Sequence, residues 1–87
     1  MDREQAERLE RELRKSLTDL IEKSLRTSGV SKSALALQVN IARETLRRNV
    51  ANGDLTIPQL YRIAPLIGGD FFLWMDELRA LVEEVAE

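Results

Sequence analysis

Residues 31–53 read SKSALALQVNIARETLRRNVANG, and this stretch decides the fold. Its apolar residues recur at helical spacing on both sides of Asn40, and asparagine is, after glycine, the residue that best tolerates a left-handed backbone. The pattern predicts a short helix over 32–39, a tight turn at Asn40 and a second helix over 43–51. A turn this short does not let the two helices lie antiparallel, so we expect them to cross steeply.

A steep crossing needs a small side chain where the two helices meet, and Ala36 lies on the inner face of the first helix. Leu46 is placed to fill the angle between the helices from the second one, with Val39 and Ile41 beside it. The polar residues of the second helix then remain on the outside of the motif: Arg43, Glu44, Arg47 and Arg48.

Upstream of the motif, leucine and isoleucine recur at spacings of three and four between residues 9 and 25. This periodicity predicts an amphipathic helix over about 3–27. Gly29 suits the left-handed residue that often closes a helix, and Ser31 offers a side-chain oxygen to cap the next one. The motif is therefore expected to follow a longer helix directly.

Downstream of the motif, Thr56 and Gln59 have the spacing of a capping box, which predicts a helix from about residue 57. Pro65 lies inside this helix and removes one of its backbone hydrogen bonds. The last turn should therefore be kinked or shortened.

The chain then predicts one more helix before its end. Gly68-Gly69 ends the preceding element, and Asp70 can cap a helix over about 71–86. Because there is no strand signal, no repeat and no linker, we expect residues 1–87 to form a single all-α domain. The predicted fold class is a compact bundle of about five helices that contains a helix-turn-helix at 31–53.

Composition excludes several classes of function. The chain has no cysteine and no histidine, so it lacks the usual disulfides, the usual zinc ligands and the usual nucleophiles and bases of enzymes. The acidic pairs Asp76-Glu77 and Glu83-Glu84 are adjacent on a helix and point in different directions, which disfavours a metal or acid–base site. We therefore expect no catalysis and no cofactor.

Membrane association is also disfavoured by the composition. No apolar run approaches the roughly 20 residues that cross a bilayer, and the N-terminus does not have the pattern of a secretory signal. The expectation is a cytoplasmic protein with no membrane partner.

Charge is distributed unevenly along the chain, although the formal net charge is only −2. Residues 1–22 carry five basic and seven acidic side chains, residues 23–62 carry seven and two, and residues 63–87 carry one and six. A nucleic-acid phosphate senses the local field rather than the net charge. The concentration of positive charge around the predicted helix-turn-helix therefore favours double-stranded DNA as a partner.

Over about residues 20–69 the sequence resembles the Xre and Cro family of bacterial and phage repressors, which have a helix-turn-helix. The matching residues are Leu35-Ala36, Ile41, Thr45-Leu46, Leu60-Tyr61-Arg62-Ile63-Ala64 and Leu66-Ile67-Gly68. Three positions depart from the family pattern. Asn40 replaces the usual glycine of the turn, and Ala42 stands where a serine or threonine would cap the second helix of the motif. Asn49 occupies a position that is normally apolar, and Val50 is expected to take over that core position.

The resemblance implies a lambda-repressor-like fold whose second motif helix lies in the major groove of DNA. Arg43, Glu44 and Arg48 would read bases, since arginine can donate to guanine and glutamate can accept from cytosine. The implied phosphate contacts are Lys32, Ser33, Thr45 and Arg47. The alternative is a solvated helix face on which Glu44 pairs with Arg47 or Arg48.

A partner surface is predicted at the C-terminal helix, within 70–87. Phe71 to Met75 form an unbroken apolar run, and one helix face cannot bury five consecutive residues. The side chains assigned to a homodimer interface are Phe71, Phe72, Trp74, Met75, Leu78, Leu81 and Val82. The alternative is that this helix only closes a monomer core.

The N-terminal extension, residues 1–12, admits two interpretations. Ala6, Leu9 and Leu13 lie before the part of the helix that a repressor fold needs for its own core, so they can pack across a dimer. Mixed charges on the same segment fit a frayed and solvated terminus equally well.

These observations predict a transcription regulator, a dimeric repressor that binds a pseudo-palindromic operator, with a phage or prophage source consistent with its size. The rival hypothesis is a protein-interaction module, such as an antitoxin or adaptor. That module would use the same fold and bind a protein partner through the aromatic side chains around Phe72 and Trp74.

Overall fold

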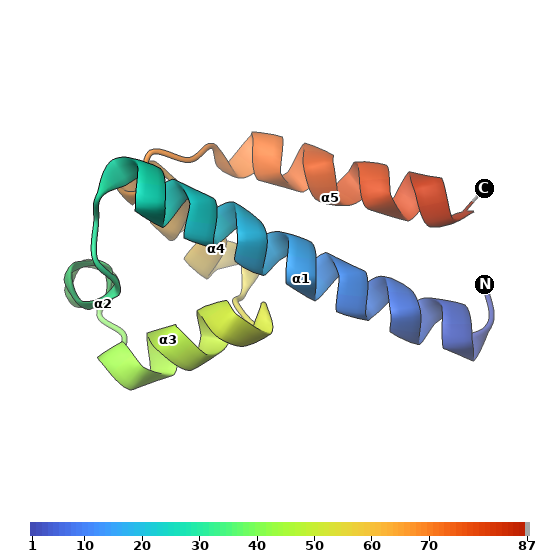
Figure 1. Cartoon of the computed structure of the whole chain (residues 1–87), viewed down its shortest axis with the longest axis horizontal. Helices are drawn as coiled ribbons and strands as arrows, with labels where there is room; N and C mark the ends of the chain where they lie inside the picture. Colours follow the sequence, from blue (N-terminus) through green and yellow to red (C-terminus); the bar gives the residue numbers. More distant parts are fainter. Residues whose placement is uncertain (87) are drawn as a thin grey trace.

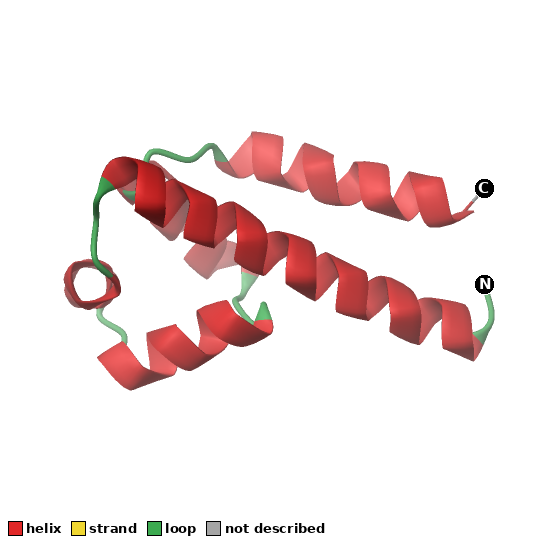
Figure 2. Ribbon diagram, in the orientation of Figure 1, coloured by secondary structure: helices red, strands yellow, loops and turns green. Residues whose placement is uncertain are grey.

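The computed structural model describes residues 1–86 and contains five helices. They are α1 (Arg3–Ser28), α2 (Lys32–Val39), α3 (Arg43–Asn52), α4 (Ile57–Leu66) and α5 (Phe71–Ala86) (Figure 1). No strand occurs within the described residues, and Figure 2 shows only short loops between the helices. The all-α bundle is confirmed, and its helix boundaries agree with the predicted ones to within about one residue.

Side-chain caps explain where several helices begin. Ser31 Oγ accepts a hydrogen bond from the Ala34 amide at 3.0 Å, and Asp70 accepts from two amides in the first turn of α5. Thr56 and Gln59 form the capping box at the start of α4. All three predicted caps are confirmed, because a cap depends on residues only two or three apart.

The end of α4 shows how Pro65 is accommodated. The helix ends at Leu66, one residue later, so the amide donor that Pro65 lacks interrupts the backbone hydrogen bonds only in the last turn. Gly68 then adopts a left-handed conformation with φ of +74°, and the Gly69 amide donates to the Ala64 carbonyl at 2.8 Å. The proline therefore shortens the helix, as predicted.

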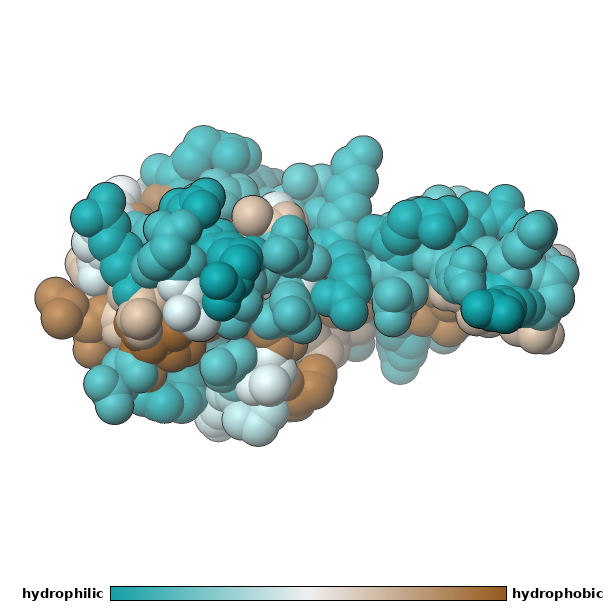
Figure 3. All heavy atoms as spheres, turned by 90° about the horizontal axis from the view of Figure 1, so that it is seen from below, coloured by the Kyte–Doolittle hydropathy of each residue, from teal (hydrophilic) through white to brown (hydrophobic). Residues whose placement is uncertain are grey.

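α1 is the longest element and organises the others around it. α5 runs antiparallel beside it, so the two termini lie at the same end of the molecule (Figure 1). α2, α3 and α4 gather around the C-terminal part of α1, and Figure 3 shows the result from the α3 side as a broad lobe and a narrower arm. Hydrophilic side chains cover most of this face.

The core lies where the helices converge in the broad lobe. Its largest fully buried side chains come from four of the helices and the turn after α4: Ile21, Leu35, Leu46, Val50, Leu60, Ile63 and Ile67. No helix in the described residues combines the length and apolar character needed to cross a membrane.

The N-terminal extension is an ordered part of α1. Asp2 and Gln5 form a capping box that the sequence analysis did not identify, and it starts the helix at Arg3. Leu9 is 7% exposed within the single chain, but Ala6 and most other side chains of the extension are exposed. The segment is thus helical rather than frayed and remains largely solvated, and its packing across a dimer stays a prediction.

Candidate nucleic-acid interface

α2 and α3 form the steeply crossed pair that the sequence predicted. In Figure 1 α2 is seen end-on while α3 lies across the view. Ala36 is 3% exposed and Leu46 is fully buried, as expected for the small and the large side chain at the crossing. Asn40 makes the turn in a left-handed conformation, with φ of 55° and ψ of 47°. The helix-turn-helix geometry at 31–53 follows from these three residues.

The two ends of α3 differ in how they are held. Its N-terminal residue Arg43 follows Ala42, whose side chain makes no capping hydrogen bond, at a cost of about 1 kcal/mol relative to a serine or threonine. At the other end Val50 is fully buried while Asn49 is partly exposed. Val50 therefore takes the core position that Asn49 leaves, as predicted.

The outer face of α3 presents one acidic and three basic side chains, all exposed. Glu44 and Arg47 pair with each other, and Arg47 Nε lies 3.1 Å from each carboxylate oxygen of Glu44. The structure records no ion pair for Arg43 or Arg48 among residues 1–86. The alternative of a self-paired surface thus describes Glu44 and Arg47 but leaves Arg43 and Arg48 available to a ligand.

This ion pair also shifts the acid–base behaviour of both groups. The hydrogen bond from Arg47, and then its charge, lower the pKa of the Glu44 carboxyl, and Arg48 and Arg43 act in the same direction. The same hydrogen bond and the charge of Glu44 raise the pKa of Arg47. Glu44 is therefore ionised at neutral pH and can act only as a hydrogen-bond acceptor.

The residues that were predicted to contact phosphate have different surroundings in the structure. Lys32 Nζ lies 2.7 Å from Glu22 Oε1, and both side chains are about two-thirds buried, so Lys32 joins α2 to α1. Ser33 lines a hollow together with Arg43, and Thr45 is half-buried. The structure thus brings Ser33 and Arg43 together and engages Lys32 elsewhere.

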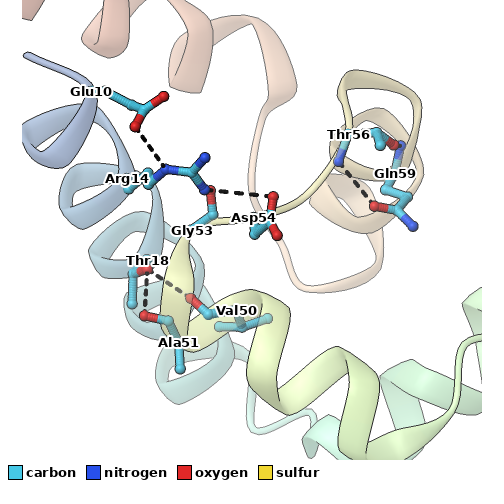
Figure 4. A network of polar contacts seen from close by, with 9 residues as sticks. All are labelled: Glu10, Arg14, Thr18, Val50, Ala51, Gly53, Asp54, Thr56 and Gln59. Atoms are coloured by element: carbon cyan, nitrogen blue, oxygen red, sulfur yellow. Dashed lines mark hydrogen bonds and ion pairs between the residues drawn. The ribbon is translucent and has the colours of Figure 1, made fainter. Parts of the chain in front are cut away.

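Polar contacts from α1 hold the C-terminal end of α3 (Figure 4). Thr18 Oγ1 donates to the Val50 carbonyl at 2.7 Å, and Arg14 Nη1 donates to the Gly53 carbonyl at 3.4 Å. Arg14 also lies 3.5 Å from Asp54. These contacts could not be predicted from the sequence, because nothing local links positions that lie more than thirty residues apart. Their spacing of four on α1 places them on one face but does not identify its neighbour.

The residues assigned to a homodimer fall into three groups. Phe72 is 67% and Val82 36% exposed, whereas the side chains of intermediate exposure are Phe71, Met75, Leu78 and Leu81. Trp74 is 4% exposed and belongs to the core of its own chain, so its assignment to the partner surface is corrected. The bulky indole fills space beside Gly69, where an added Cβ would meet its ring.

The exposed apolar surface that remains at α5 is aromatic and includes a residue from α4. Tyr61, 60% exposed, packs edge-on against Phe71 at a ring-centroid distance of 5.5 Å, and Phe71 packs against Phe72 at 5.3 Å. Leu73 is also exposed, at 61%. We call Tyr61, Phe71 and Phe72 the aromatic patch.

Comparison of the chain with family models, with curated proteins and with solved structures finds no match. The resemblance to the Xre and Cro repressors therefore stays a prediction from the sequence.

Proposed function

We propose that this protein is a non-enzymatic, sequence-specific regulator of transcription that binds double-stranded DNA as a homodimer, with α3 in the major groove. The observation that carries the proposal is the steep α2–α3 crossing, which leaves Arg43 and Arg48 exposed on the outer face of α3, without an ion pair to any of residues 1–86. The major groove of B-DNA admits an α-helix, and an arginine can donate two hydrogen bonds to guanine O6 and N7.

The other residues of α3 have supporting roles in this proposal. Glu44 can accept from cytosine N4 through a carboxylate lone pair that Arg47 does not use, and Arg47 keeps donor groups for a phosphate. Thr18 and Arg14 keep the far end of α3 on α1, so the helix enters the groove as a rigid body. Lys32 supports α2 through Glu22 and is not proposed to contact phosphate.

The dimer is proposed to form through the aromatic patch and the exposed side chains of α5. A two-fold dimer presents two copies of α3 to half-sites about one helical turn apart, so the operator is a pseudo-palindrome. Occupying such an operator excludes other proteins from it, which is repression. This role places the protein in a bacterial cytoplasm or nucleoid, and a phage origin is compatible with it.

The test is selection of bound sequences from random duplex DNA by the purified chain, repeated with the double variant Arg43→Ala, Arg48→Ala. The expected result is a DNA sequence motif with two-fold symmetry. The variant should bind that motif at least about 30-fold more weakly, because each bidentate contact to guanine is worth about 1 to 3 kcal/mol. Affinity should also fall steeply with salt, by about 0.9 log units per log unit of salt for each phosphate neutralised.

The matched control is the double variant Arg8→Ala, Arg11→Ala. Both side chains are exposed on the N-terminal half of α1 and make no recorded ion pair within residues 1–86, so this variant loses the same charge far from α3. It should keep the selected motif. If wild-type protein that is shown to be folded enriches no sequence, or if both double variants lose the motif equally, the proposal is wrong.

The second candidate is a protein-interaction module, an antitoxin or adaptor, and the aromatic patch is the observation that favours it. Tyr61 and Phe72 are large, exposed and adjacent through Phe71, which is typical of a protein contact. Phe72→Ala is the suitable probe for this candidate, because a change at Trp74 would disturb the core. Absence of any selected DNA motif would favour this candidate over the first.

A further inference from the structure

Leu37 is an apolar side chain in an unusual position. It is 84% exposed, more than any other large apolar side chain in residues 1–86, although α2 buries Leu35 and Val39 on either side of it. Helical spacing places Leu37 opposite those two residues, so the sequence contained this signal. An isolated exposed leucine needs no functional explanation by itself, so the residues around Leu37 decide whether it belongs to a binding surface.

The surroundings of Leu37 are a hollow of about 460 Å³ between α2, the turn and the start of α3. Its lining is mostly aliphatic and contains no acidic side chain: Ser33, Ala36, Leu37, Asn40, Ile41, Ala42 and Arg43. Ala42 contributes a methyl group where a serine or threonine would have capped α3. The hollow thus combines aliphatic walls, two neutral polar groups and one unpaired guanidinium.

This combination of groups matches the base edges that thymine and guanine present in the major groove of DNA. In the major groove thymine alone presents a C5-methyl group, and guanine presents the acceptors that arginine reads. Aliphatic groups beside Arg43 therefore suit a thymine next to a guanine, with Ser33 and Asn40 able to face the neighbouring backbone. A protein partner is less well matched, because Arg43 brings an unpaired charge to the edge of a small aliphatic surface.

We infer that Leu37 is a specificity-determining residue that contacts the C5-methyl group of a thymine beside the guanine read by Arg43. This inference rests on the proposed function. It adds a base that the polar residues of α3 do not account for, and it assigns that base to α2.

The test replaces single thymines of the selected operator by deoxyuridine, which removes only the methyl group. At one thymine position per half-site, this replacement should make wild-type protein bind the operator about fourfold more weakly than the unmodified operator, since a buried methyl group is worth about 0.8 kcal/mol. In Leu37→Ala the same replacement should change affinity less than twofold. Leu66→Ala is the matched control: Leu66 is 39% exposed on α4, outside the hollow, and its variant should keep the wild-type penalty.

The possible outcomes separate this inference from the proposed function. If wild-type protein selects no motif, the proposed function fails and the inference fails with it. If a motif is selected but deoxyuridine has no effect on wild-type protein, or an equal effect on Leu37→Ala, only the inference is overturned. The wild-type comparison decides the first point, and the penalty in Leu37→Ala is a ratio of two affinities measured on the same protein, so a lower fraction of folded variant cancels from it.

Discussion

Gly53 provides a sharp test of how the helix-turn-helix is attached to α1. It closes α3 in a left-handed conformation, with φ of 61° and ψ of 37°, and its backbone is buried. A Cβ at this position would lie 2.7 Å from the Arg14 Cα and 2.8 Å from the Arg14 carbonyl carbon. These are main-chain atoms inside a helix, so they cannot move aside as a flexible side chain could.

Gly53→Ala should therefore be destabilising for two separate reasons. A left-handed conformation costs an alanine about 1 to 2 kcal/mol, and overpacking against a fixed neighbour costs typically about 1 to 3 kcal/mol more. The expected loss in the free energy of unfolding is about 2 to 5 kcal/mol, a large share of the stability of a small domain. Part of this loss should appear as weakened contacts from Thr18 and Arg14 to the end of α3.

Gly29→Ala is the matched control, because Gly29 also closes a helix with φ of 74° but has nothing within 4 Å of an added Cβ. It should lose only the conformational part, and its midpoint should fall by about 4 to 16 °C, at about 4 to 8 °C per kcal/mol. Thermal and urea unfolding followed by circular dichroism measure both variants. If Gly53→Ala is no more destabilised than Gly29→Ala, the close approach of the α3–α4 turn to α1 is refuted.

Three further predictions address single contacts. Thr18→Val removes the donor to the Val50 carbonyl and should cost about 1 kcal/mol in unfolding by urea, whereas Thr45→Val, which loses no recorded hydrogen bond, should cost less. Arg47→Ala should raise the pKa of Glu44, seen by carboxyl-carbon NMR. In wild-type protein the contribution of this pair to stability is present above the unfolded-state pKa of Glu44 and is lost as the pH falls through its lowered folded-state pKa. If the titration midpoint of Glu44 is the same in Arg47→Ala as in wild-type protein, the pair does not form in solution. Phe72→Ala should weaken self-association at least about 30-fold by sedimentation equilibrium, because hot-spot aromatics lose about 2 kcal/mol or more on truncation, and an equally dimeric variant would exclude the aromatic patch as the interface.

Much of the fold could be predicted because its signals are local. Asn40 takes the left-handed turn, Ser31 and Asp70 cap their helices, and apolar periodicity defines the five helices. Each of these depends on residues within one or two turns of each other. The departure at Asn49 could also be predicted locally, since Val50 lies four residues after Leu46 and therefore shares its buried face.

The candidate site could be predicted only in part. The outward face of α3 follows from helical spacing, and so do Arg43 and Arg48 upon it. Helical spacing does not show which of the charged side chains are already paired with each other. The Glu44–Arg47 pair was one of two arrangements open to the sequence, and the contact between Lys32 and Glu22 joins two helices whose relative placement no pattern specifies.

By itself, then, the sequence determined the helices, their ends and the sharp turn between α2 and α3, because backbone conformation and capping depend on near neighbours. Only the tertiary structure decided which apolar side chains the chain covers for itself. Trp74 and Leu9 are buried by their own chain, whereas Leu37 and Phe72 remain exposed. All four are large and apolar in the sequence, and their difference arises from which helix lies beside each one, since burial depends on distant neighbours.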